Sequence, residues 1–272
     1  MVTNKQLIFS KIPNGRPING EHIQVKETAL DIDAALPDGD FILKTLEIAN
    51  AAFDINKPMT GDTVSIVVKS NNPNYKVDDI VVGRSTFGLL ESYVQVSADY
   101  AKEAYVVRNE AKSNALPLSN YVGALGMPGF TAWYGLTEIG QPKKGEVLCV
   151  SSAASPVGQM VGQLGKAFGL KVVGSAGSEE KIQYLKSVGF DAVFNYREGD
   201  ILENLKVHCL DGIDIYFESV GGKMLDAVLK VANKFARIIA CGMSSQYSLS
   251  TPTPLYNTMY IVTKRIKFDG FW

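Results

Sequence analysis

The residues best suited to chemistry form a run of small side chains between a strand-like and a helix-like segment. Residues 147–150 are apolar, and only serine, alanine, proline and valine lie between them and Gly158. Small side chains let a backbone approach a pyrophosphate, whose charge is met by free amides and by the positive end of a helix. Ser152, Ser155 and Gly158 hold the three glycine positions of the dinucleotide fingerprint. Pro156 suits a first helical turn, so we predict a phosphate-binding loop here.

Four glycines continue this segment on one helical face: Gly158, Gly162, Gly165 and Gly169. They would let a helix lie unusually close to a sheet. Tight helix packing alone is therefore the alternative explanation of the small residues. The order of strand, turn and helix favours binding of a dinucleotide cofactor.

The end of the next strand-like run bears on the choice between NAD and NADP. An acid about 20 residues past the fingerprint would bind the ribose hydroxyls of NAD. The segment 171–178 contains no acid, so a 2′-phosphate would meet no repulsion at Ser175 and would find donors in Ser178 and Lys181. Two glutamates directly before Lys181 argue against this, although acids in a first helical turn are also favoured by the helix dipole. We predict NADP(H) as the cofactor.

Metal chemistry has little material in this sequence. The two histidines, His22 and His208, do not form a ligand pattern with a cysteine or a carboxylate. Cys149, Cys209 and Cys241 lie far apart in the sequence and imply no disulfide framework. We expect a metal-free site, and a packed thiol at Cys241 unless that side chain is exposed beside the cofactor.

The elements that must position the phosphate loop are alternating strand-like and helix-like segments. From residue 145 onward, apolar strand-like runs recur at intervals that fit a strand plus a crossover helix. The runs are residues 147–150, 172–173, 192–194, 213–217, 238–241 and 266–268. This pattern predicts an α/β fold with a doubly wound parallel (Rossmann) sheet.

The first part of the chain has a different rhythm, with short β-like runs separated by Pro, Asn and Gly turns. The runs are residues 6–9, 23–25, 41–48, 63–68, 80–82 and 92–96. We predict a β-rich domain over residues 1–118 and the Rossmann domain over 119–272. Residues 121–139 have helical spacing and end at Gly140, so they are expected to join the two.

Length and composition agree with this division. A chain of 272 residues with 46% hydrophobic residues fits two globular domains. The 27 basic and 28 acidic residues give a net charge of -1, so we expect no nucleic acid or anionic membrane as a partner. No apolar stretch suits a signal peptide or a spanning helix, and we expect a cytoplasmic protein.

Six stretches spread over the chain carry a family resemblance: residues 72–79, 123–133, 161–164, 174–181, 219–222 and 244–247. On these stretches the sequence resembles the zinc-free medium-chain dehydrogenase/reductases. Within them it is similar to the NADPH-dependent alkenal and enone double-bond reductases, which include the leukotriene B4 dehydrogenase/prostaglandin reductase type. The resemblance implies a leading domain of the GroES-like β type before the Rossmann domain.

The resemblance also implies an activity and a catalytic residue. The activity is hydride transfer from NADPH to the β-carbon of a small α,β-unsaturated aldehyde or ketone. Negative charge develops on the carbonyl oxygen and needs donors already in place. Tyr247 matches the family tyrosine that faces this oxygen, and a phenol can donate a hydrogen bond while neutral at pH 7. The alternative is a half-exposed surface tyrosine in a polar turn.

The same resemblance implies the residues that bind the cofactor. Lys181 and Tyr196 would hold the 2′-phosphate end of NADPH, and Met127 and Thr131 would lie near the nicotinamide. Core packing and a solvated helix surface are the alternative roles of Met127 and Lys181. The implied set is completed by Ser152, Ser155, Val157, Gly158, Ser178, Ser219, Cys241 and Gly242.

The sequence departs from the family pattern in several places. Family members carry a pocket-lining segment soon after the strand that here ends at Asn50, and they continue past the strand at residues 266–268. We expect this chain to lack that internal segment and the C-terminal one. Asp78 replaces a turn glycine, which is a mild change because Asp tolerates the left-handed region.

Two other functions remain open from the sequence. The departures would fit a non-catalytic NADP(H)-binding protein or fragment, and the superfamily also contains NADPH quinone reductases. Relatives commonly pair their Rossmann sheets edge to edge, so a homodimer through residues 266–272 is also expected.

Overall fold

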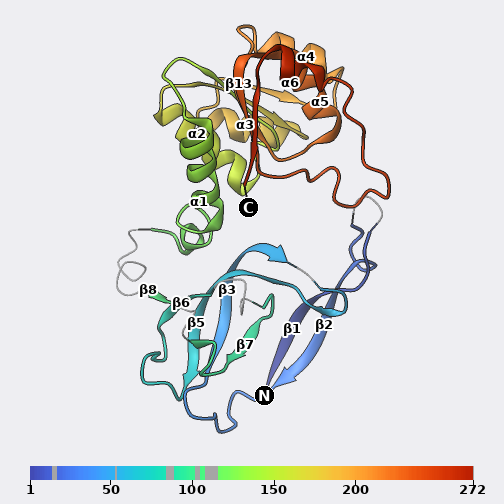
Figure 1. Cartoon of the computed structure of the whole chain (residues 1–272). Coiled ribbons are helices and arrows are strands. Elements are labelled where there is room, and N and C mark those ends of the chain that lie inside the picture. Colours follow the sequence, from blue (N-terminus) through green and yellow to red (C-terminus); the bar gives the residue numbers. More distant parts are fainter. Residues whose placement is uncertain (14–16, 53, 84–88, 102–104, 108–115, 272) are drawn as a thin grey trace. The chain divides into compact units, whose positions relative to one another are not determined.

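The computed structural model describes residues 1–13, 17–52, 54–83, 89–101, 105–107 and 116–271. The chain divides into two compact units, Met1–Met127 and Pro128–Trp272 (Figure 1). The domain boundary between residues 118 and 119 stays a prediction. Phe53, close to the expected missing segment, and Trp272 at the chain end lie outside the described residues.

The leading unit is built from antiparallel strands. In its first sheet, β1 lies between β2 and a short β4; the bounds are β1 (Val2–Phe9), β2 (Ile23–Leu30) and β4 (Lys57–Pro58). The second sheet has the order β7 (Tyr93–Val96), β3 (Phe41–Ala52), β5 (Thr60–Ser70), β6 (Ile80–Gly83) and β8 (Tyr105–Val107). Asp78 adopts a positive φ of 70° in the turn before β6, as the sequence predicts for a residue that replaces a turn glycine.

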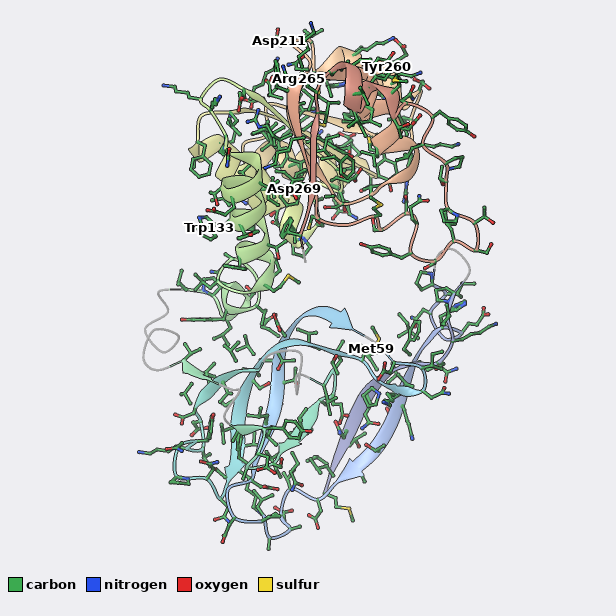
Figure 2. The ribbon with its side chains drawn as sticks, viewed as in Figure 1. Met59, Trp133, Asp211, Tyr260, Arg265 and Asp269 are labelled. Atoms are coloured by element: carbon green, nitrogen blue, oxygen red, sulfur yellow. The ribbon has the colours of Figure 1, made fainter. Side chains whose placement is uncertain are left out.

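Small apolar clusters hold each sheet of the leading unit. The ring of Phe41 stacks on Tyr75 with centroids 4.3 Å apart, inside a cluster that joins β3, β5, β6 and β7. Met59, labelled in Figure 2, packs with Phe9 and Leu90 in a second cluster. Burial of these side chains supplies the hydrophobic stabilisation of an otherwise turn-rich unit.

The second unit contains one six-stranded parallel sheet. Its order is β11 (Ala192–Asn195), β10 (Lys171–Ala176), β9 (Val147–Val150), β12 (Ile213–Glu218), β13 (Ala232–Ala240) and β14 (Lys267–Gly270). Numbered along the chain, this is the order 3-2-1-4-5-6 of the doubly wound dinucleotide-binding fold. The predicted fold class is confirmed: a Rossmann-type α/β sheet preceded by antiparallel β-structure.

Helices cover both faces of the parallel sheet, because alternate side chains of each strand point to opposite faces. One cluster packs α2 (Pro156–Ala167) and α3 (Glu179–Ser187) on residues such as Leu148 and Val172. The opposite cluster packs α4 (Ile201–His208), α5 (Gly222–Val231) and α6 (Met259–Thr263) on residues such as Cys149 and Val173. The strands read as continuous apolar runs for this reason.

The single helix expected over residues 121–139 is wrong in detail. The segment forms a 3₁₀ helix η2 (Leu118–Tyr121), the α-helix α1 (Met127–Tyr134) and a π-helical segment η3 (Gly135–Gly140). At Gly126 the backbone passes so close to Tyr121 that a Cβ would lie 2.9 Å from the Tyr121 carbonyl oxygen. Pro128 is tolerated in the first turn of a helix, and α1 accordingly begins one residue before it, at Met127.

No helix in the described part of the chain is long and apolar enough to cross a membrane.

Candidate functional site

The sequence-predicted site residues other than Met127 and Thr131 follow strands that end at one edge of the parallel sheet. Parallel strands bring their carboxyl ends to the same edge, and the strand order reverses at β9, between β10 and β12. Ligands of doubly wound sheets bind at this switch point. The predicted residues form three groups there, after β9, after β10 and β11, and after β12 and β13.

The first group is the turn from β9 into α2. Ser152 has a positive φ of 49°, which a glycine adopts freely and a serine only at a cost. Ser155 caps α2: its Oγ accepts a hydrogen bond of 3.1 Å from the N–H of Gly158. The two serines at glycine positions therefore preserve the backbone conformation of the turn. Ser155 also accepts a hydrogen bond from one of the otherwise unpaired amides at the start of the helix.

Gly158 forms the floor of this turn. A Cβ there would lie 2.5 Å from the Ser152 carbonyl oxygen and 2.8 Å from the Ala153 backbone, so only glycine fits. Among the described residues, no hydrogen bond uses the N–H of Val157, which points from the first turn of α2. A free amide at the positive end of a twelve-residue helix, above a cradle that a Cβ would fill, fits a pyrophosphate.

The second group follows β10 and β11. Ser175 is 1% exposed and its Oγ has no partner among the described residues, so the choice between cofactors passes to the residues after it. Ser178 begins α3 without a capping hydrogen bond from its side chain, and Lys181 is exposed one turn later. Tyr196 reaches back to Gly177, where a Cβ would lie 2.9 Å from the phenol oxygen.

Arg197 was not predicted from the sequence and belongs to the same group. Its guanidinium lies 5.6 Å from the centre of the Tyr196 ring, and its Nε would be 3.1 Å from a Cβ on Gly177. The signal in the sequence was its position next to Tyr196. The Tyr196 hydroxyl and the Arg197 guanidinium thus lie at Gly177, and Ser178 and Lys181 follow it in the chain. Hydroxyls and cations are the donors that a phosphate monoester requires.

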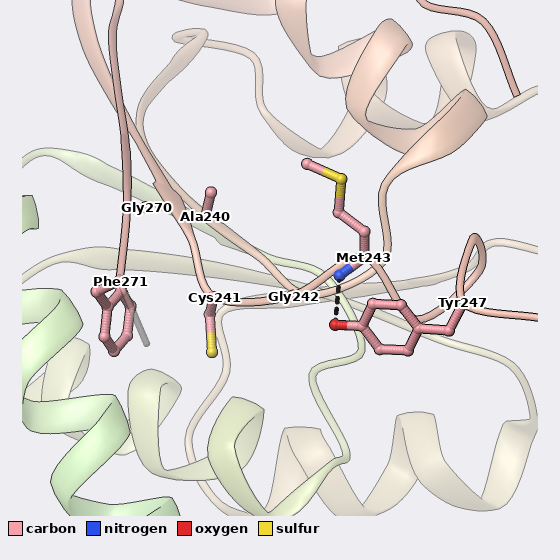
Figure 3. Close-up of a pocket in the computed structure, with 7 residues that line it drawn as sticks. All are labelled: Ala240, Cys241, Gly242, Met243, Tyr247, Gly270 and Phe271. Carbon is pink, nitrogen blue, oxygen red and sulfur yellow. Dashed lines mark hydrogen bonds between the residues drawn. The ribbon is translucent and has the colours of Figure 1, made fainter. Parts of the chain in front are cut away.

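The third group lines an open cavity of about 500 Å³. Its walls are Ala240, Cys241, Gly242, Met243, Tyr247, Gly270 and Phe271 (Figure 3). Three sequence-predicted residues thus meet here, at the carboxyl ends of β13 and β14.

Tyr247 lies over the backbone that leaves β13. Its ring is 71% exposed, but its phenol oxygen accepts a hydrogen bond of 2.9 Å from the Met243 N–H (Figure 3). A Cβ on Gly242 would lie 2.8 Å from the same oxygen, so the glycine makes room for it. Because the backbone N–H is the donor, the phenol keeps its own proton to donate.

Ser219 and Cys241 lie beside this cavity. The Ser219 N–H donates to the Ser151 Oγ at 2.9 Å, and its carbonyl oxygen accepts from the Ser244 N–H at 3.0 Å. Burial raises the pKa of the Cys241 thiol, against a weaker opposing effect of its hydrogen bond with Ser219. Cys241 is therefore a protonated, weakly nucleophilic wall of the cavity at neutral pH.

Met127 and Thr131 do not line this cavity. They are four residues apart on α1, so they share one face of that helix. Their predicted position near a nicotinamide stays a prediction.

The described residues contain no group of three or more His, Cys, Asp or Glu side chains able to hold a metal ion. Within the described residues, the donor set therefore does not fit a zinc site.

Sequence comparison places the chain among known oxidoreductases. A family model described as zinc-binding dehydrogenase matches residues 156–272. The NADP(+)-dependent 2-alkenal reductase of Nicotiana tabacum is 38% identical, over 99% of this chain and 81% of the relative. The (+)-pulegone reductase of Mentha piperita is also 38% identical, over 100% of this chain and 82% of the relative.

Structure comparison agrees with the sequence. The crystal structure of CurA from Vibrio vulnificus in complex with NADPH has a TM-score of 0.81 and 33% identity to this chain. The match covers 98% of this chain and 82% of CurA. These similarities agree with the strand order of the parallel sheet. The chain belongs to the medium-chain dehydrogenase/reductases, in the branch of NADP-dependent alkenal and enone double-bond reductases.

Proposed function

We propose that this protein uses NADPH to reduce the carbon–carbon double bond of α,β-unsaturated aldehydes or ketones. The observation that carries the proposal is the hydrogen bond from the Met243 N–H to the Tyr247 phenol oxygen, in a cavity beside the nucleotide edge. It leaves the phenol proton free for a substrate carbonyl. The Nicotiana relative is a 2-alkenal reductase and the Mentha relative is a (+)-pulegone reductase, which supports the same chemistry.

The residues that would hold NADPH lie along the carboxyl edge of the sheet. The turn over Gly158 and the free N–H of Val157 would receive the pyrophosphate. Ser178, Lys181 and Tyr196 would receive the 2′-phosphate, with Arg197 beside them. Ser219, Cys241 and Gly242 would line the path from the pyrophosphate to the cavity. NADPH, when bound, supplies the hydride.

Tyr247 would serve the substrate rather than the cofactor. As the double bond gains a hydride at its β-carbon, negative charge develops on the carbonyl oxygen, and the Tyr247 O–H would donate to it. The Met243 N–H fixes the phenol in place and, by donating to its oxygen, stabilises negative charge there. The phenol is thus both oriented and made a stronger donor.

The test is the oxidation of NADPH, followed at 340 nm, with a short 2-alkenal as substrate. Tyr247→Phe removes one donor to the developing oxyanion and should lower kcat by about 10²-fold. Its Kd for NADPH, measured by cofactor fluorescence, should change by less than about twofold, because the effect is confined to the transition state. A Tyr247→Phe variant with full turnover would exclude the phenol as donor.

The same assay separates the alternatives. NADPH fluorescence enhancement without oxidation by alkenals, enones or quinones would favour a non-catalytic NADP(H)-binding protein. Faster turnover of quinones than of alkenals would favour a quinone reductase. The Tyr247 hydrogen bond argues against the first, since a binding protein has no need of an oriented phenol.

Assembly and location complete the proposal. A homodimer would form through β14, the last strand of the parallel sheet, on which Asp269 lies (Figure 2). A cytoplasmic location is supported by three free cysteines within the described chain. Light scattering tests the dimer, and a variant with Phe268→Lys on the edge strand should shift it to monomer.

A further inference from the structure

Glu218 is a fully buried carboxylate at the carboxyl end of β12, which the proposed chemistry does not use. It is 0% exposed. Its Oε1 accepts from the N–H groups of Val220 and Gly221, at 2.5 and 2.9 Å, and lies 3.1 Å from the Ser151 Oγ. Its Oε2 has no hydrogen bond among the described residues. A buried carboxylate is costly unless it is well paired, so its place needs a reason.

The hydrogen bonds of Glu218 fix the turn between β12 and α5. Both N–H groups that it binds belong to this turn, and Ser151 binds the third one, that of Ser219. Gly221 has a positive φ of 75°, so the backbone can fold back toward the carboxylate. A single side chain thus joins the end of β9 to the turn after β12, on both sides of the strand-order reversal.

The Ser219–Gly221 turn is hydrogen-bonded to the segment that carries Tyr247. The Ser244 N–H donates to the Ser219 carbonyl oxygen, and the Ser245 N–H donates to that of Val220, both at 3.0 Å. The Ser245 Oγ also donates to the Val220 carbonyl oxygen at 2.6 Å. At the start of the segment, the N–H groups of Cys241 and Gly242 donate to the Glu218 backbone oxygen.

We propose that Glu218 is a positioning residue for the reaction: it holds the Ser219–Gly221 turn, and through it the segment that places the Tyr247 phenol. The inference rests on the proposed function. Glu218 is fully buried and is not among the residues that line the cavity. Glu218 affects cofactor affinity because it positions Ser219. It affects turnover because the turn that it holds is hydrogen-bonded to Ser244 and Ser245.

Variants of Glu218 test the proposal, with Glu91 as the matched control. Glu218→Gln keeps the Oε1 acceptor and the shape of the side chain. Glu218→Ala leaves two buried N–H groups unpaired. Glu91, also buried, accepts from the Asn4 Nδ2 at 2.7 Å in the leading unit. Glu91→Ala should lower the unfolding temperature and leave NADPH affinity and kcat unchanged.

The expected result is rescue by Gln and loss with Ala. Glu218→Ala should raise the Kd for NADPH and lower kcat with a 2-alkenal, each about tenfold, because two hydrogen bonds to a buried carboxylate are lost. Glu218→Gln should stay within about threefold of the wild type in both. Equal losses in the Gln and Ala variants, or no loss in either, would overturn the proposal.

A second background separates positioning from general destabilisation. In Tyr247→Phe the phenol is already absent, so Glu218→Ala should lower kcat by less than about threefold there, while its effect on NADPH affinity persists. A full tenfold fall in both backgrounds would show that Glu218 does not act through Tyr247. If the wild type lacks alkenal turnover, the proposed function fails, and the NADPH affinities still decide the role of Glu218.

Ser245→Ala covers the case in which Glu218→Ala does not fold. Ser245 is exposed, so this variant should fold, lose the bond to Val220, and lower kcat about threefold with unchanged NADPH affinity. An unchanged kcat in Ser245→Ala would overturn the route through this segment.

Discussion

The buried polar side chains of the two units have different roles. In the leading unit, Glu91 binds Asn4, whose Oδ1 accepts from the Tyr93 N–H, so the pair ties β1 to the start of β7. In the Rossmann unit, Glu218 binds the amides of a turn that faces the cavity. Both carboxylates are buried, yet one joins strands to each other and the other joins strand ends to a loop.

Unpaired polar atoms sharpen this difference. Within the described residues, Ser175 Oγ, Tyr216 Oη and Glu218 Oε2 are buried without hydrogen bonds in the Rossmann unit, and Thr45 Oγ1 in the leading unit. Three of the four therefore lie near the carboxyl edge of the parallel sheet. Uncompensated burial is costly and is tolerated where a site requires it. Polar burial in the leading unit joins strands to each other, whereas the unpaired polar atoms of the Rossmann unit lie at the edge where we propose that the cofactor and substrate bind.

Crowded glycines give the largest test of this comparison. Gly158→Ala puts a Cβ 2.5 Å from the Ser152 carbonyl oxygen, so the turn must open, and NADPH affinity should fall about 100-fold. The matched change in the leading unit is Gly39→Ala, where φ is +84° and the Cβ would lie 2.7 Å from the Ala98 Cβ. Gly39→Ala should lower the unfolding temperature while the Kd for NADPH, by fluorescence titration, stays at the wild-type value. Equal losses of affinity in both variants would break the comparison.

An ion pair at the amino end of the parallel sheet tests whether NADPH binding depends on the whole Rossmann unit or only on its carboxyl edge. Arg237 binds both oxygens of Glu146 at 2.9 and 2.6 Å, and its Nε donates to the Gly140 carbonyl oxygen. Both side chains are less than one-fifth exposed. Arg237→Gln should lower the free energy of unfolding by about 2–3 kcal/mol, because the partner charge stays partly buried.

The control for Arg237 is a surface pair of the leading unit. Lys57 and Asp54 are 69% and 73% exposed, and Lys57→Gln should change stability by less than about 0.5 kcal/mol. Urea unfolding measures both variants. NADPH affinity should survive in Arg237→Gln, and a tenfold loss there would show that the whole Rossmann unit, rather than its carboxyl edge, determines binding.

Much of the fold was predictable from the sequence because its strands are buried on both faces. The six apolar runs after residue 145 each overlap a strand, although residues 172–173 extend to Lys171–Ala176. The short strands Lys57–Pro58 and Tyr105–Val107 were missed. These depend on partners elsewhere in the chain, and local periodicity carries no information about such pairing.

The site was predictable where a motif determines the backbone and less so where side chains meet across strands. The turn over Gly158 was found because small residues between a strand and a helix have few explanations. Glu218 was not singled out, although an acid directly after an apolar strand was a visible signal. Its role depends on contacts with Ser151 and with Val220 and Gly221, and no spacing rule relates β9 to β12.

The preference for NADPH over NADH can be tested at one cation of the carboxyl edge, Lys181. Lys181→Gln removes one charge from the group that contains Tyr196 and Arg197, and the Kd for NADPH should rise about tenfold. Because NADH lacks the 2′-phosphate, its Kd should not change. Lys44→Gln, on the exposed surface of β3, is the control and should alter neither Kd. A parallel rise in both dissociation constants would place Lys181 outside the 2′-phosphate site.

The smallest effect concerns the pH dependence of stability. Burial raises the pKa of Glu218, and the hydrogen bonds from Val220, Gly221 and Ser151 oppose this only in part. Tyr216, Cys149 and Cys241 are the titratable groups that interact with it, and the pKa of each is itself raised, with burial the first cause except at Cys149, where the hydrogen bond with Cys209 comes first. All three are neutral at pH 7, so none of them offsets the charge of the carboxylate.

The sign of the effect follows from proton binding. With a raised pKa, folded Glu218 holds its proton more tightly than the unfolded chain does. The stabilisation is complete below the unfolded pKa and is lost as the pH rises through the folded pKa, with a slope of at most about 1.4 kcal/mol per pH unit. Glu218→Gln should remove this slope from urea unfolding curves measured across that window. A slope that survives the substitution would assign it to another group and leave Glu218, like Glu91, a carboxylate that serves the fold.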